Sequence, residues 1–215
     1  MLLITFFMLC TTMIKSQTLQ ILLPSNDQRI KDEQKNQAKA DDAISLILDT
    51  EYKSNGLPAV DENGNTLHDI YYYEGLPDTV NISGTKGCIK VAHFIGNAPG
   101  GKRQGIREIL YQRHKEAMDI YDQLKADYKA KKITDEQFAE KAKETATNEN
   151  LKHPVVIIKP GPNATYEALV NAIDELNLNQ IRKYSIQMPD RTDTTLLRNY
   201  EKATGKTVIR PNVRK

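Results

Sequence analysis

The stretch HPVVIIKPGPNATYEALVNAIDELNLNQIRKYSIQ, residues His153–Gln187, carries the clearest fold signal in the chain. Its apolar run PVVIIK at 154–159 predicts a buried strand, and KYSIQM at 183–188 predicts a second one. Between them, a Pro-Gly-Pro turn precedes Asn163 and Thr165, either of which suits a helix N-cap. The apolar side chains that follow recur at helical spacing: Tyr166, Leu169, Val170, Ile173 and Leu176. The stretch therefore predicts a strand, a helix and a second strand in one compact unit.

Three more strands are predicted upstream of this unit. AISLIL at 43–48 is a short apolar run, and HDIYYYE at 68–74 is rich in aromatic and β-branched side chains. CIKVAHFI at 88–95 has the same character. Turn-forming residues at 61–65 and 75–78 separate these runs.

The segment 104–147 has the character of a helical hairpin inserted among the strands. Apolar side chains recur at spacings of three, four and seven over about 104–131, which predicts one amphipathic helix. A second helix is predicted from Thr134 to about Thr147, because Thr134 and Gln137 form a capping-box pattern.

The chain ends in a short predicted helix and a basic tail. The helix covers about 193–204 and stops at Gly205, a natural residue just after a helix end. The tail contains Arg210, Arg214 and Lys215. We therefore divide the chain into a folded α+β domain at 43–190 and a C-terminal helix with a basic tail at 191–215.

The N-terminal residues 1–14, MLLITFFMLCTTMI, are uncharged and apolar but shorter than the roughly 20 residues of a spanning helix. They fit part of a membrane helix, and less well a cleaved secretory or lipoprotein leader. Thr5 and Thr12 fall on one helix face, so they are candidates for a face turned toward protein or water. Alternatively, each hydroxyl bonds its own i−4 carbonyl. Residues 15–42 follow as an extended segment at 17–23 and a charged, flexible linker.

Composition and motifs exclude several function classes. Lysine and arginine number 30 against 28 aspartates and glutamates, a balance that argues against a nucleic-acid-binding protein. The chain has two cysteines, and its histidines lack the spacing of metal ligands. Asp61, Asn63 and Asn65 begin like a calcium loop, but Thr66 replaces the required glycine, so a simple turn is expected. No metal, cofactor or catalytic residue is predicted. The four histidines are expected to be surface or half-buried residues: His68, His93, His114 and His153.

One glycine-rich segment keeps a nucleotide-binding enzyme open as an alternative. Gly96, Gly101 and Lys102 match the spacing G-x-x-x-x-G-K between a predicted strand and a predicted helix. Arg103 occupies the next position, where a phosphate-binding loop has the serine or threonine that holds magnesium. A glycine-rich connection into the helix is the simpler interpretation.

Three segments, in this order, resemble the ExbD/TolR family of biopolymer transport proteins. Leu2–Pro24 resembles the family's membrane helix and the extended segment after it. Ile47–Gly56 and Asp69–Asp78 resemble the early strands of its periplasmic domain, in the form common among Bacteroidetes-type members. His153–Gln187 resembles its strand-helix-strand core, and Tyr166 matches the tyrosine at the start of that helix.

The resemblance implies a fold, a location and partners. The expected fold is α+β: a partial N-terminal membrane helix, a flexible linker, and a small periplasmic domain with a mixed sheet and an inserted helical hairpin. The expected protein crosses the inner membrane once and has its C-terminal domain in the periplasm. An ExbB/TolQ-like ring protein, a TonB/TolA-like protein and a second copy of the chain are the implied partners.

The resemblance also implies a role in a motor driven by the proton-motive force, without an active site or cofactor of its own. The family's proton carrier is an aspartate in the first part of the membrane helix, and this position would precede Met1. We therefore expect Met1 to be a misassigned or truncated start. The remaining alternative is a secreted or lipid-anchored periplasmic binding protein.

Overall fold

The computed structural model of the chain describes residues 43–208, apart from 54, 63, 82, 83, 85 and 149. Thr5, Thr12, the partial membrane helix at 1–14 and the segment 15–42 lie outside the described residues. Within the described part, no helix has the length and apolar character needed to cross a membrane.

Five strands form one mixed sheet in the order β3-β2-β1-β4-β5. The strands are β1 Ala43–Thr50, β2 His68–Glu74, β3 Lys90–Ala92, β4 Val155–Pro160 and β5 Tyr184–Ile186. β1 pairs antiparallel with β2 and parallel with β4, while β2 pairs antiparallel with β3 and β4 pairs parallel with β5. The sheet thus joins an antiparallel meander to a parallel β-α-β unit, and this is the α+β domain with a mixed sheet that the sequence predicts.

The sheet has an apolar core on each face, because successive side chains of a strand point to opposite sides. Leu46, Tyr72 and Ile158 are neighbours across three strands and belong to the larger core. Ile47 and Tyr71, the next pair in register, belong to the smaller core on the other face. Apolar burial on both faces predicts that helices cover both sides of the sheet.

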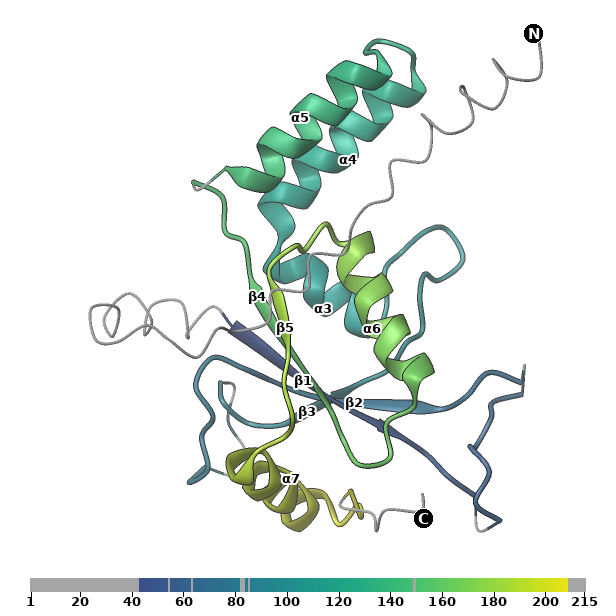
Figure 1. The fold of residues 1–215 in the computed structure, drawn as a ribbon, viewed down its shortest axis with the longest axis vertical. Coiled ribbons are helices and arrows are strands. Elements are labelled where there is room, and N and C mark those ends of the chain that lie inside the picture. The colour runs from purple at the N-terminus through teal and green to yellow at the C-terminus, as the bar shows by residue number, and fades with distance from the viewer. Residues whose placement is uncertain are drawn as a thin grey trace, which may run out of the picture.

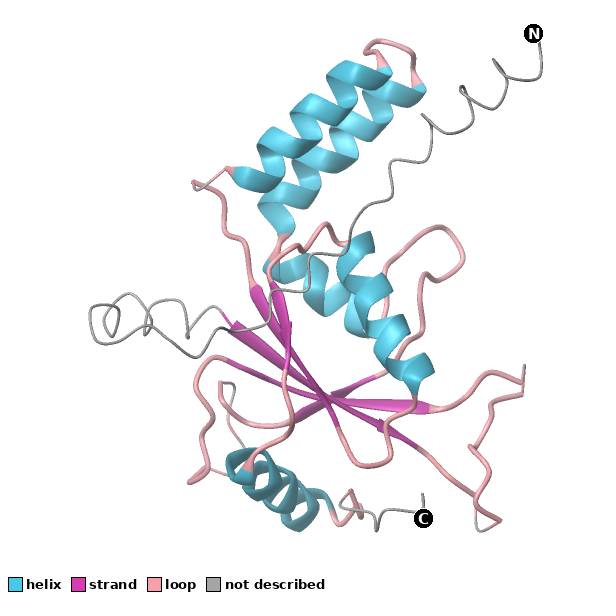
Figure 2. Cartoon of the chain, viewed as in Figure 1, coloured by secondary structure: helices cyan, strands magenta, loops and turns pink. Residues whose placement is uncertain are grey.

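Helices cover the two faces unequally. α3 Ile106–Arg113 and α6 Tyr166–Leu178 pack on the larger core, and α7 Arg191–Thr204 packs on the smaller one through Leu196. Figure 1 shows α3 and α6 on one side of the sheet and α7 on the other, and Figure 2 shows the strands between these helices. Because α7 covers a face of the sheet, it belongs to the folded unit formed by the strands.

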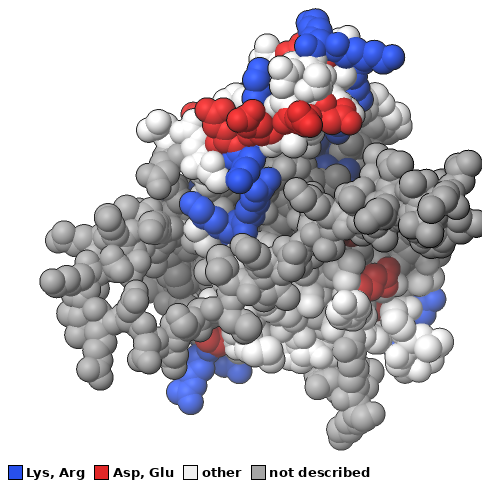
Figure 3. Space-filling view, turned by 45° about the horizontal axis from the view of Figure 1, so that its top comes forward, with Lys and Arg blue, Asp and Glu red and all other residues white. Residues whose placement is uncertain are grey.

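α4 Lys115–Lys129 and α5 Asp135–Thr147 form the helical hairpin between β3 and β4, as expected. The hairpin extends away from the sheet (Figure 1), and its two helices meet where Phe138 lies 5.1 Å from Tyr128 between ring centroids. The predicted capping box of Thr134 and Gln137 is confirmed in both directions. No residue of α5 is buried. Both signs of charge lie close together over this end of the molecule on the face seen in Figure 3.

β5 covers only part of the strand predicted at 183–188, and two other predicted elements differ more in extent. The helix expected at 104–131 is two helices, because His114 leaves the helical conformation with φ −118° and ψ 21° between α3 and α4. Its ring is held by the Asn179 carbonyl and by His153, and these contacts fix the break. The strand expected at 88–95 shortens to β3, since the His93 carbonyl accepts the Ile106 amide instead of pairing along a strand.

The apolar stripe predicted for α6 is only partly buried. Tyr166 is 80% exposed and Val170 is also exposed, although both belong to this stripe. Leu176 is buried as expected, and its buried companions are the small residues Ala168 and Ala172. Small side chains let the helix lie close to the sheet. The open choice of N-cap is settled by Thr165, whose side chain accepts the Ala168 amide at 3.1 Å.

Candidate functional site

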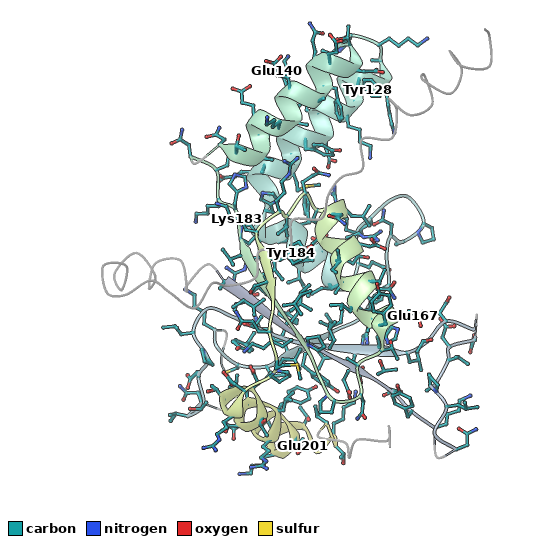
Figure 4. The ribbon with its side chains drawn as sticks, in the orientation of Figure 1. Tyr128, Glu140, Glu167, Lys183, Tyr184 and Glu201 are labelled. Atoms are coloured by element: carbon teal, nitrogen blue, oxygen red, sulfur yellow. The ribbon has the colours of Figure 1, made fainter. Side chains whose placement is uncertain are left out.

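A groove of about 960 Å³ lies between α6, the segment 93–96 and the arm at 51–67 that connects β1 to β2. Figure 4 shows Glu167 at the end of α6 that faces this arm. Six carboxylates line the groove, against two lysine or arginine side chains, Arg107 and Lys206. We call this feature the acidic groove. Its carboxylates are Glu51, Asp61, Asp69, Glu167, Asp174 and Glu175.

One face of α6 supplies much of the acidic groove. Glu167, Asn171, Asp174, Glu175 and Leu178 all line it, at spacings that place them on one side of a helix. The opposite side of α6 packs on the sheet, so the helix is held rigidly while it presents this polar face. Thr66 of the arm donates a hydrogen bond to Glu167 Oε2 at 2.9 Å, which ties the two walls of the groove together.

Arg107 and Glu175 form the floor contact of the groove. Arg107 Nε and Nη2 donate to the two Glu175 oxygens at 2.8 and 2.6 Å, and Nη1 donates to Asn97 at 3.0 Å. The hydrogen bonds to Glu175 raise the pKa of the Arg107 guanidinium, although its burial acts in the opposite direction. A bidentate pair of this kind orients both groups. It also neutralises one of the six carboxylates, and Glu167 and Asp174 are among the five that remain.

His68 is buried at the wall of the groove, with a side chain only 3% exposed. Its Nδ1 lies 3.0 Å from Thr50 Oγ1, and its ring meets Phe94 edge to face. Nε2 has no hydrogen-bond partner and lies 3.8 Å from Glu167 Oε2. Burial lowers the pKa of His68, and the negative charges of Glu167 and Asp69 offset only part of this effect. The neutral ring therefore presents an unsatisfied nitrogen beside an exposed carboxylate.

The glycine-rich segment at 96–102 does not have the geometry of a phosphate-binding loop. It is a tight hairpin in which the Ala98 amide donates to the Lys102 carbonyl at 2.8 Å and the Gly101 amide donates to the Ala98 carbonyl at 3.0 Å. Phosphate-binding loops leave such amides free to surround the phosphates. Arg103 closes the hairpin, since it donates to Asp122 at 2.7 Å and stacks on the Tyr111 ring. This geometry removes the support for the nucleotide-binding alternative.

The calcium-loop-like segment at 61–65 is a turn, and the histidines form no metal site within the described residues. The Asn65 amide and side chain both donate to the Asp61 carboxylate, at 2.8 and 3.0 Å, which makes the simple turn that was expected. Across the described residues, no group of three or more metal-ligating side chains comes together. The expectation that the histidines are surface or half-buried residues was wrong for His68 and His114, which are 7% and 2% exposed. Thr5 and Thr12 lie outside the described residues.

A family model described as biopolymer transport protein ExbD/TolR matches residues 1–191. The chain belongs to the ExbD/TolR family. The matched range spans the apolar N-terminal residues, the linker and all five strands, and it ends where α7 begins. Searches of curated proteins and of solved structures gave no match. The family resemblance stated from three separate segments is thus confirmed over one continuous range.

Sequence reasoning identified the family of this ExbD/TolR protein but missed its acidic groove. The residues that line the groove come from β2, the arm, α3 and α6, which are far apart in the sequence. One available signal was the polar face of α6, since Glu167, Asn171, Asp174 and Glu175 recur at helical spacing. That spacing identifies a face of one helix, and the groove also needs the arm that lies against it.

Proposed function

We propose that this chain is the accessory subunit of an inner-membrane motor driven by the proton-motive force. Its partners in this proposal are an ExbB/TolQ-type ring protein and a TonB/TolA-type protein that acts on the outer membrane. The observation that carries the proposal is the family match over 1–191, which includes the apolar residues 1–14 as well as the folded domain. The mixed α+β sheet fits the periplasmic domain expected for such a subunit.

The proposed division of labour follows the chain. Residues 1–14 belong to the single membrane helix, where Thr5 and Thr12 face the ring. Residues 15–42 link this helix to the domain, and their polar, charged composition suits a tether that lets the domain reach partners at a distance. The domain works in the periplasm as a homodimer and exerts its effect by binding and movement, without catalysing a reaction.

Co-purification with the ring protein tests the proposal. We would co-express the full chain, tagged at its C-terminus, with the ExbB/TolQ-type protein of the same genome and extract the membranes in mild detergent. The expected result is a stable complex that elutes as one species. The matched control is the same chain without residues 1–14, which should fold but should not be retained by the ring.

Two outcomes would contradict the motor role. One is a full chain that is released as a freely soluble periplasmic protein whose mature N-terminus lies near Lys15, because a cleaved leader then replaces the membrane helix. The other is a membrane-bound chain that does not associate with the ring under conditions in which a known member of the family does.

A further inference from the structure

We infer that the acidic groove is a binding site for a lysine side chain on an extended, cationic segment of a partner protein. The inference does not depend on the motor role, because it rests on the groove's own side chains. Two observations carry it: the excess of carboxylates at the groove, and the unsatisfied nitrogen of His68 within it.

The position of His68 defines the ligand chemistry. The 3.8 Å between His68 Nε2 and Glu167 Oε2 is too long for a hydrogen bond. One ammonium nitrogen placed between them can donate to both at the ordinary distance of about 2.9 Å. Nε2 accepts such a bond when Nδ1 carries the proton and donates to Thr50 Oγ1 at 3.0 Å. A lysine ammonium therefore satisfies the buried nitrogen and pairs with Glu167 in a single contact.

The remaining carboxylates explain why the ligand is a segment rather than an isolated amine. Asp174 is exposed two turns along α6 from Glu167, on the same face. A second cationic side chain reaches it while the first occupies the His68 position. The groove volume of about 960 Å³ accommodates several residues of an extended peptide. Since the whole chain has a net charge of +2, a cationic peptide is drawn to this groove and not to the protein in general.

Peptide binding to the full chain in detergent tests the inference. The probe is a fluorescein-labelled peptide of alternating lysine and glycine, and fluorescence anisotropy measures its binding. The test variant is Glu167→Gln with Asp174→Asn, which keeps the size of both side chains and removes their two negative charges. The control variant is Glu140→Gln with Glu144→Gln, which removes the same charge from exposed positions of α5. We expect the Kd of the test variant to rise at least tenfold and that of the control to change less than twofold.

Two further measurements sharpen the result. His68→Gln should weaken the binding of the lysine peptide. A peptide with acetylated lysines should bind neither this variant nor the wild type. A chain truncated after Val208, which lacks the basic tail, should bind the lysine peptide with unchanged affinity. Equal weakening by the test and control variants would show that only general charge attraction exists. Much tighter binding after truncation would show that the chain's own tail is the occupant, and would also overturn the inference.

A separate observation concerns the pair His114 and His153 at the base of the hairpin. His114 Nδ1 lies 2.8 Å from the Asn179 carbonyl, His114 Nε2 lies 2.9 Å from His153 Nδ1, and His153 Nε2 lies 2.9 Å from the Asn148 carbonyl. A carbonyl only accepts, so both outer nitrogens must carry protons. The inner contact needs one proton more. The four ring nitrogens of His114 and His153 are therefore all satisfied only when the pair holds three protons and one positive charge.

The geometry points to a proton-dependent joint for the hairpin. His114 lies between α3 and α4, and His153 follows α5 in the chain. The pair therefore connects both ends of the hairpin to the C-terminal end of α6 through the Asn179 carbonyl. Loss of the shared proton sets the lone pairs of His114 Nε2 and His153 Nδ1 against each other, unless one ring changes tautomer and turns an outer lone pair toward a carbonyl. A further proton sets two N–H groups against each other. Neither histidine forms an ion pair within the described residues. The nearest charges along the chain are Arg113, which pairs with Glu74, and the side chains of Lys115 and Lys152.

Nitrogen NMR of the full chain with 15N-labelled histidine tests this joint between pH 8.5 and 5. We expect both outer ring nitrogens to read as protonated over a shared pH window. His153→Gln, which removes the second ring of the pair, should abolish this shared window at His114 while the sheet stays protected from hydrogen exchange. An outer nitrogen that reads as unprotonated throughout would overturn the inference, and so would unchanged pH dependence in the variant.

Discussion

At the scale of single residues, the most constrained polar contact joins Lys159 of β4 to Asp193 of α7. The Lys159 ammonium donates to both Asp193 oxygens, at 2.8 and 2.7 Å, and to the Tyr73 hydroxyl at 3.0 Å. Asp193 is fully buried and also accepts the Asp190 amide at 2.8 Å, as part of the capping box of α7. Burial lowers the pKa of Lys159, but the hydrogen bonds to Asp193 and Tyr73 outweigh it, so the net effect raises the pKa and the amine stays charged.

Asp193→Asn should therefore destabilise the domain by about 3–5 kcal/mol, because it leaves a buried ammonium without its counter-charge. Urea denaturation at pH 7 measures the loss. The matched control is Asp127→Asn, which breaks the exposed pair with Lys132 at 3.0 Å and should cost less than about 1 kcal/mol. Equal losses in the two variants would contradict the role assigned to the buried pair. Adding Lys159→Met to Asp193→Asn should recover part of the stability.

His68 makes the stability of the domain depend on pH. Burial lowers its pKa in the folded state below the ordinary value of 6.5, so the unfolded chain binds the proton more tightly. The contribution of His68 is fully present above pH 6.5 and declines as the pH falls from there toward its folded pKa. The free energy of unfolding should therefore decrease between pH 7.5 and 5.

In His68→Gln this decrease should be smaller. It should not vanish, because burial also lowers the pKa of His114. Urea titrations at five pH values in this range measure both slopes. A variant with the same slope as the wild type would show that Glu167 and Asp69 fully compensate the burial of the ring.

At the scale of elements, the sequence predicted the features that depend on neighbouring residues, such as helix caps and strand burial. Adjacent residues determine a helix cap and the burial pattern of a strand. The sequence therefore predicted the capping box at Thr134 and the strands around Tyr71 and Val156. The break at His114 was not readable, since its cause is a ring held by Asn179 and His153, 65 and 39 residues away. The acidic groove was missed for the same reason. Its walls are distant in sequence, and only the fold brings Thr66 against Glu167.

The cap of α5 should control the local stability of the hairpin. Thr134 Oγ1 accepts the Gln137 amide at 3.3 Å, and Gln137 Oε1 accepts the Thr134 amide at 3.1 Å. Thr134→Ala should cost about 1 kcal/mol. Because no α5 residue is buried, we expect this cost as local opening, with hydrogen exchange about fivefold faster in α5 and unchanged in β1 and β4.

Thr145→Ala is the matched control for the cap. Thr145 lies inside α5, is partly exposed, and bonds only the Lys141 carbonyl with its hydroxyl. Alanine is the better helix former, so exchange in α5 should stay equal or become slower. Faster exchange in both variants would mean that replacing either threonine destabilises α5, and that the cap does not specifically control its local stability.

At the scale of the whole molecule, the sheet with α3, α6 and α7 is a self-sufficient core, and the outer hairpin is an addition to it. The buried residues of α4 are Ala117 and Met118, both in its first turn, and α5 has no buried residue. Replacing residues 121–143 with a four-residue glycine-serine linker should therefore leave the free energy of unfolding within about 1 kcal/mol of the wild type. Met118→Ala in the full-length chain is the contrasting control, because loss of a buried methionine costs about 2–5 kcal/mol.

The shortened chain also separates folding from partner binding. Its circular dichroism should show less helix, while its unfolding midpoint and the hydrogen exchange of β1, β4 and α6 stay unchanged. Loss of that protection would mean that the hairpin stabilises the core through its outer turns, against the burial pattern. If the shortened chain keeps its fold but no longer co-purifies with the ring protein, the hairpin is the element that contacts the motor. If it still co-purifies, the contacts lie in the residues that the core and the N-terminal segment supply.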